Sequence, residues 1–188
     1  MKKVSLLLAL LTTVFFVSCE GPAGPPGPPG FDGRDGLDGL DGINILGQVI
    51  DIEGTFDFNN DYSLFYEFPN TVEVFESDVV LVYILWDQTE DNNGDPVDIW
   101  RLLPQTRLLN QGILLYNYDH TFFDVSIFLE ADFDLGLLQP GDTDNQVFRI
   151  AIVPAEFAQG SRFDRSNVEQ VMNLLKVEEG NIPRYKLN

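Results

Sequence analysis

The sequence predicts a mainly β fold, an antiparallel β-sandwich or barrel-like domain with one helix near its C-terminus. Within residues 44–188, short segments alternate apolar and polar residues, as strands with one buried face do. Clusters of Gly, Pro, Asn and Asp separate these segments. One later segment has its apolar residues at helical spacing. We therefore expect seven to nine strands in one domain, which we call the head.

Residues 1–18 predict an export signal. Lys2 and Lys3 precede an apolar run over residues 4–17, and the small residue Ser18 follows the run. A membrane-spanning helix needs about 20 apolar residues, and this run of 14 is shorter. The alternative is an uncleaved anchor helix.

Cys19 follows the signal and is the only cysteine of the chain, so it has no partner for an intramolecular disulfide. The preceding residues, "FVSC" from Phe16 to Cys19, resemble the lipobox of bacterial lipoproteins, with phenylalanine where many members have leucine. The resemblance implies that Cys19 is lipidated, which would tether the protein to a membrane without crossing it. Glu20, where retention in the inner membrane typically uses Asp, favours the bacterial outer membrane. Whether the head would face the periplasm or the cell surface stays open.

A strict three-residue repeat begins two residues after the cysteine. Strict Gly-X-Y spacing is typical of the collagen triple helix, because only glycine fits at the axis where three chains meet. The repeat resembles that of bacterial collagen-like proteins. We therefore expect residues 19–43 to form a short extended stalk of roughly 70 Å, from about 3.1 Å per residue. The repeat glycines are Gly21, Gly24, Gly27, Gly30, Gly33, Gly36, Gly39 and Gly42.

Two states of this stalk are open. Three chains could assemble into a homotrimer, or one chain could serve as a monomeric spacer with the same extended local geometry. The second half of the repeat is acidic, and only Arg34 offsets its charge, so the carboxylates of three parallel chains would repel one another. These carboxylates belong to Asp32, Asp35, Asp38 and Asp41.

The head contains several clear strand patterns. In residues 122–131, Phe123, Val125, Ile127 and Leu129 are predicted to lie on one face. Residues 79–86 are apolar throughout, which predicts a central strand covered on both faces. The remaining predicted strands lie within residues 62–68, 98–104, 112–118 and 147–154.

One helix is predicted within residues 166–176. Ser166 and Glu169 have the spacing of a capping box at its start. Its apolar residues fall on one face, which indicates packing on the core rather than a binding site. These residues are Val168, Val171, Met172 and Leu175.

No catalytic constellation is predicted, and we expect no enzyme. The single histidine, His120, follows Asp119, but the pair lies where a hairpin turn is expected. No second histidine or cysteine is present to complete a zinc site. No phosphate-binding glycine loop follows a strand.

The chain is strongly acidic, with 30 Asp and Glu against 11 Lys and Arg and a net charge of −19. Loss of Lys2 and Lys3 with the signal would take the net charge from −19 to −21. This charge disfavours nucleic acid and anionic lipid as partners. Calcium prefers oxygen ligands, and Asp91, Asp95 and Asp98 are weak candidates for a Ca²⁺ site in the loop "EDNNGDPVD". The alternative for this loop is a solvated hairpin turn.

The sequence thus favours a non-enzymatic, membrane-anchored lipoprotein. Its collagen-like stalk would present a β-rich head for structural or adhesive interaction, as a homotrimer or a monomer. The alternative is a module that binds an extracellular ligand such as a carbohydrate, with Trp86, Trp100 or Tyr118 as a platform. For these three aromatics we favour core packing over a ligand platform. Whether the ligand is a protein or a glycan is open.

Overall fold

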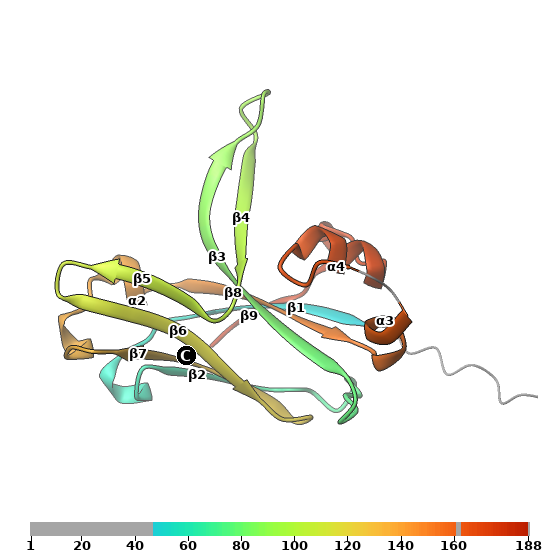
Figure 1. Ribbon diagram of the computed structural model, residues 1–188, viewed down its shortest axis with the longest axis horizontal. Helices are drawn as coiled ribbons and strands as arrows, with labels where there is room; N and C mark the ends of the chain where they lie inside the picture. Colours follow the sequence, from blue (N-terminus) through green and yellow to red (C-terminus); the bar gives the residue numbers. More distant parts are fainter. Residues whose placement is uncertain (1–46, 161–162, 188) are drawn as a thin grey trace, which may run out of the picture. The chain divides into compact units, whose positions relative to one another are not determined.

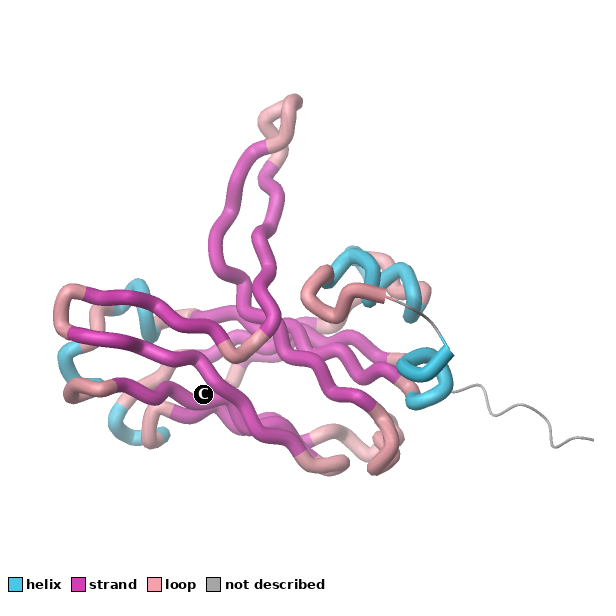
Figure 2. The backbone as a smooth tube through the Cα atoms, viewed as in Figure 1, coloured by secondary structure: helices cyan, strands magenta, loops and turns pink. Residues whose placement is uncertain are grey.

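The structure is a computed structural model that describes residues 47–160 and 163–187, all within the predicted head. Nine strands in these ranges form two sheets (Figures 1 and 2). The five-stranded sheet has the order β4-β3-β8-β1-β9, and the four-stranded sheet has the order β2-β7-β6-β5. The strands are β1 (Gln48–Gly54), β2 (Ser63–Glu67), β3 (Val79–Glu90), β4 (Pro96–Leu102), β5 (Gln105–Leu109), β6 (Gly112–His120), β7 (Asp124–Ala131), β8 (Gln146–Val153) and β9 (Arg184–Lys186).

The two sheets pack face to face as a sandwich. Ile52, Val82 and Phe148 of the five-stranded sheet are fully buried against Tyr116 and Ile127 of the four-stranded sheet, in one apolar cluster. Alternation along each strand produces this core, because every second side chain points inward. The predicted mainly β class is confirmed, and of the two architectures predicted the structure has the sandwich.

The five-stranded sheet is covered on its outer face as well. Helix α4 (Val168–Leu175) places Val171 and Leu175 against Leu81 and Tyr83 of β3. Residues Val80–Ile84 are therefore all buried, and the central strand predicted from their unbroken apolar run is confirmed. The apolar face predicted for the helix is confirmed too, since Val171, Met172 and Leu175 are buried.

An ion-pair network fastens the C-terminal segment to this outer face. Arg149 of β8 is 1% exposed, and its Nε donates to Oδ1 of Asp51 on β1 at 2.8 Å. Its Nη1 donates to Oε2 of Glu179 at 2.7 Å, and its guanidinium lies over Trp100 at 4.2 Å. Burial alone would lower the pKa of Arg149, but the hydrogen bonds to Asp51 and Glu179 raise it above its usual value. Arg184 of β9 also pairs with Asp51, at 3.2 Å.

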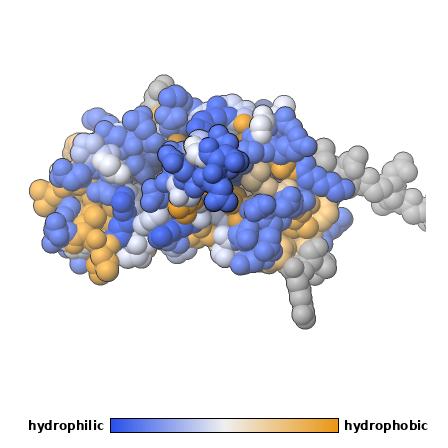
Figure 3. All heavy atoms as spheres, turned by 90° about the horizontal axis from the view of Figure 1, so that it is seen from above, coloured by the Kyte–Doolittle hydropathy of each residue, from blue (hydrophilic) through white to orange (hydrophobic). Residues whose placement is uncertain are grey.

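The β3–β4 hairpin extends beyond the rest of its sheet (Figures 1 and 2). The register shifts between Leu85 and Asp87, so Trp86 is an extra residue that opposes no partner. Such a bulge bends and twists a strand. Beyond it, residues 87–90 and 96–99 pair only with each other. The space-filling view from above, onto the hairpin tip, shows a largely hydrophilic middle (Figure 3).

Three details of the prediction are wrong. Phe123 is 63% exposed, because it lies in the turn before β7 rather than on the buried face of the strand. The N-cap of α4 is Asn167, whose side chain accepts from the backbone of Gln170, whereas Ser166 hydrogen bonds to Asp164. The fold is not wholly antiparallel, since β9 runs parallel to β1.

Two further helices were not predicted. Helix α2 (Pro140–Thr143) replaces an expected turn, and α3 (Ala155–Gly160) follows β8. The 3-10 turns η2 (Phe58–Asn60), η3 (Leu135–Leu137) and η4 (Glu179–Asn181) complete the fold.

Candidate functional site

One end of the sandwich carries three exposed phenylalanines, which we call the aromatic rim: Phe75, Phe122 and Phe123. Phe75 lies in the loop that leads into β3, and the other two lie in the turn between β6 and β7. They are 39%, 46% and 63% exposed respectively. The rings of Phe122 and Phe123 are 4.0 Å apart between centroids, so the two residues form one apolar surface.

The turn that presents Phe122 and Phe123 is held by its own hydrogen bonds. Thr121 Oγ1 donates to Asp124 Oδ1 at 3.0 Å and accepts from the backbone N–H of Phe123 at 3.0 Å. The carbonyl of Phe123 accepts from the backbone N–H of Phe68 at 2.8 Å. Because these bonds fix the backbone on both sides, the two rings point outward without a strained conformation.

The facing loop is fixed in a similar way by Asp78. Its Oδ2 accepts from the backbone N–H of Phe75 at 3.0 Å, and its Oδ1 accepts from the N–H of Ala155 at 3.3 Å. The carboxylate therefore ties the loop before β3 to the start of α3.

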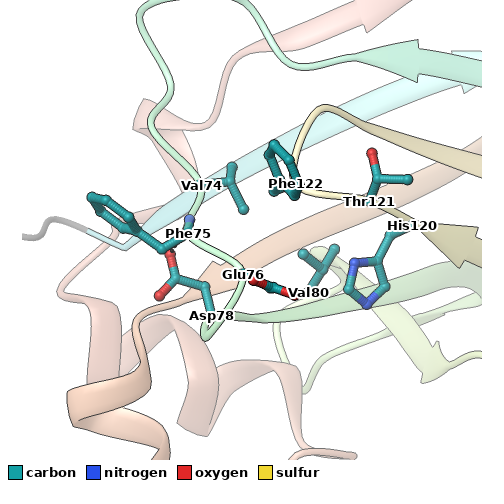
Figure 4. A pocket seen from close by; sticks show the side chains of 8 residues that line it. All are labelled: Val74, Phe75, Glu76, Asp78, Val80, His120, Thr121 and Phe122. Carbon is teal, nitrogen blue, oxygen red and sulfur yellow. Dashed lines mark hydrogen bonds between the residues drawn. The ribbon is translucent and has the colours of Figure 1, made fainter.

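A hollow of about 140 Å³ lies between the two loops (Figure 4). Val74 and Phe122 face each other across it, and Val80 of β3 lies below them near His120. A second, more open hollow on the other side of Phe122 is lined by residues 68–74 and Phe123. Neither hollow is lined by a lysine or an arginine, so this end of the head offers a partner apolar contact bordered by carboxylates.

His120 lines the smaller hollow, and its ring lies next to that of Tyr118. The two rings stack at 6.2 Å between centroids with an interplanar angle of 20°. The hydroxyl of Tyr118 donates to the carbonyl of Val80 at 3.1 Å, which fixes the ring on which His120 rests. The expectation that Asp119 and His120 lie in the hairpin turn is wrong. They are the last two residues of β6, paired with Ser126 and Val125, and the turn begins at Thr121.

The aromatic rim lies at the end of the head where the chain enters it. Gly47 precedes β1, and Gln48 pairs with Ile152 of β8. On the other side of β8, Val79 at the start of β3 pairs with Val153. Adjacent strands are about 4.8 Å apart, so the loop that carries Phe75 joins β3 about 10 Å from the entering chain.

The other candidate residues lie elsewhere. At the tip of the β3–β4 hairpin, Asp91 Oδ1 accepts from the backbone N–H groups of Asn93 and Asp95 at 2.7 and 2.9 Å. These bonds lower the pKa of Asp91 and form an ordinary Asx turn. Asp98 accepts instead from the side chain of Gln88. Among residues 47–160 and 163–187, no three His, Cys, Asp or Glu side chains are grouped so that they could hold a metal ion.

The three aromatic residues considered as a ligand platform have neighbours already. Arg101 and Arg107 both lie over the ring of Trp86, at 4.3 and 5.2 Å. Trp100 lies under Arg149, and Tyr118 packs against the sandwich core. None of the three therefore presents an open face comparable to that of Phe123.

The sequence pattern does not mark the three phenylalanines of the aromatic rim as a binding site. Because Phe123 continues the apolar–polar alternation of β7, its position in a turn cannot be recognised from that pattern. The signal that was present is the pair of polar residues, Thr121 and Asp124, that brackets Phe122 and Phe123 and closes the turn.

Cys19 and the eight repeat glycines lie outside the described residues. Within the part of the chain that the structure describes, no helix has the length and apolar character needed to span a membrane. Comparisons with protein-family models, with curated proteins and with solved structures find no match.

Proposed function

We propose that this protein is a non-enzymatic, membrane-anchored lipoprotein whose collagen-like stalk presents the β-sandwich head for structural or adhesive interaction. The observation that carries the proposal is the order of features at the N-terminus: an export signal, a single cysteine at its end, and eight glycines in strict three-residue register. An acyl chain on Cys19 would keep the protein at a membrane, and the repeat would hold the head away from it.

The head supports a binding role through its surface. The polar groups next to the aromatic rim are engaged in holding its loops together. Asp78 and Thr121 fix the loops, and the ring of His120 rests on Tyr118. What remains available to a partner is apolar ring surface, which favours contact with another macromolecule over proton transfer.

The anchor can be tested directly. The full chain is produced in a Gram-negative bacterium grown with labelled palmitate, and membranes are separated from soluble protein. We expect label on the wild-type chain and its recovery in the membrane fraction until detergent is added. Because Cys19 is the only cysteine, label on sulfur can be assigned to one residue, and Cys19→Ala should lose it. Ser5→Ala, within the apolar run, is the matched control and should keep the label. A wild-type chain that carries no label would overturn the proposal.

A further inference from the structure

We propose that the aromatic rim is a contact between copies of this chain, in which the heads of a homotrimer meet beside the end of the stalk. The inference rests on the proposed collagen-like stalk and goes beyond it, because it assigns part of the assembly to named residues of the head. The occupant is a second copy of the same head.

The short length of chain between stalk and head keeps the three heads near one another. The last repeat glycine is Gly42, and the described head begins at Gly47. Five residues span at most about 17 Å. In a triple helix the three Gly42 residues lie next to a common axis, so each Gly47 lies within about 20 Å of that axis. A five-stranded sheet is itself about 19 Å wide before its side chains are added, at about 4.8 Å per strand spacing. Three such heads therefore lie within reach of one another at this end.

The residues at that end suit a contact. The loop that carries Phe75 joins β3 two strand spacings from the entering chain, and Phe122 faces that loop across the hollow. Solvent-exposed aromatic rings gathered from two loops are typical of interaction surfaces rather than of free monomer surface. The hydrogen bonds of Asp78 and Thr121 fix the backbone of the two loops that carry the rings, so little backbone freedom would be lost on binding.

The small size of the rim is compatible with this role. A free protein–protein complex generally buries more than about 1,000 Å², which three phenylalanines do not supply. Chains joined by a stalk, however, face one another at an effective concentration in the mM range. A modest apolar contact then suffices to hold the heads together, and in return it stabilises the short repeat.

The charges beside the rim predict how association of the heads depends on salt. Glu73 and Glu76 border the two hollows, and no lysine or arginine lines them. Heads that meet there bring like charges together, which added salt screens. Association through the rim should therefore strengthen with salt, the opposite of association through ion pairs.

The test uses the chain from Glu20 to Asn188, without the lipid-bearing cysteine, measured by light scattering and sedimentation across a range of concentrations. We expect the wild-type chain to show three times the monomer mass at high concentration, with tighter association at higher salt. The double variant Phe122→Asp/Phe123→Asp should weaken association by about tenfold or more, because it places charge in the contact. Leu108→Asp is the matched control: Leu108 is 83% exposed on β5, outside both hollows, and its loss should change nothing.

Circular dichroism establishes that each variant is folded, and Phe122→Ser/Phe123→Ser replaces the aspartate pair if that pair does not fold. A trimer that is equally tight in the rim variant and in wild type would overturn the inference while leaving the stalk proposal standing. A wild-type chain that stays monomeric at all concentrations would overturn it as well. Failure of the lipoprotein proposal is recognised separately, by loss of palmitate label, since this chain carries no Cys19.

Discussion

Replacing Arg149 with methionine should cost more stability than any other single charge removal on the outer face of the five-stranded sheet. The side chain of Arg149 is 1% exposed and that of Asp51 is 4% exposed, with 2.8 Å between Nε and Oδ1. Methionine fills much of the same volume but leaves the Asp51 carboxylate buried, with only Arg184 at 3.2 Å to pair with it. Breaking a buried ion pair by removing one partner costs about 3–5 kcal/mol. Because Arg184 remains, we expect the lower end of that range.

The chain offers a matched control for this variant. Lys186 pairs with Glu53 at 2.8 Å in the same segment, but its side chain is 74% exposed. An exposed pair contributes about 0–1 kcal/mol, so Lys186→Met should barely change the free energy of unfolding. Urea unfolding of residues 20–188, followed by circular dichroism, measures both variants against wild type. The comparison holds if the dependence on urea has the same slope in all three.

A double variant separates the missing ion pair from lost packing. Asp51→Leu/Arg149→Met removes both buried charges, whereas the remaining partners Glu179 and Arg184 have side chains that are 62% and 46% exposed and can be solvated. We expect this variant to regain most of the stability lost in Arg149→Met. A cost for Arg149→Met that is no larger than that for Lys186→Met would refute the reasoning.

Two further predictions concern the head. Burial raises the pKa of Tyr116 to about 12, partly offset by its hydrogen bond with Arg107. The unfolded chain therefore ionises this phenol first, and the free energy of unfolding should fall as the pH rises above about 10. Tyr116→Phe should reduce this fall in urea unfolding series but not remove it, because burial also raises the pKa of Tyr66, Tyr83 and Tyr118. At the hairpin tip, Asp91→Ala should leave the free energy of unfolding nearly unchanged, because the site is exposed, while proteolysis between Asn92 and Gly94 becomes faster. Calorimetry of Ca²⁺ binding should give the same trace for both chains, and a binding heat that Asp91→Ala abolishes would contradict the assignment of this loop as an Asx turn.

The sandwich was predictable because its strongest signals are local. Alternation in β7 and the unbroken apolar run in β3 depend only on which faces are buried. The strands that were missed have weaker local patterns. In β1, Asp51 lies amid a buried strand and breaks its apolar run, and its burial is explained only by Arg149, 98 residues away in the sequence. A partner at that distance has no signature in the segment itself.

The candidate site could not be predicted for a related reason. Phe123 has the right residue type and spacing for the buried face of β7, and only the turn closed by Thr121 and Asp124 takes it out of the strand. The hollow beside it exists because the loop before β3 is placed opposite by pairing between β3 and β8. Proximity of segments some 45 residues apart follows from the topology of the sheets, which single-sequence patterns do not specify.

The acidic tip of the β3–β4 hairpin and the aromatic rim lie far apart along the head. This distance determines whether charge at the tips would oppose the proposed contact at the rim. The acidic hairpin tip lies at the end of β3, whereas the aromatic rim lies beside its start, near Val79. A strand of 12 residues spans about 40 Å at about 3.3 Å per residue. Electrostatic repulsion between exposed charges is largely screened beyond about 8 Å at physiological salt. In the proposed assembly, repulsion between the tips of neighbouring heads would therefore add little at the rim, where the carboxylates of Glu73, Glu76 and Asp78 oppose the contact.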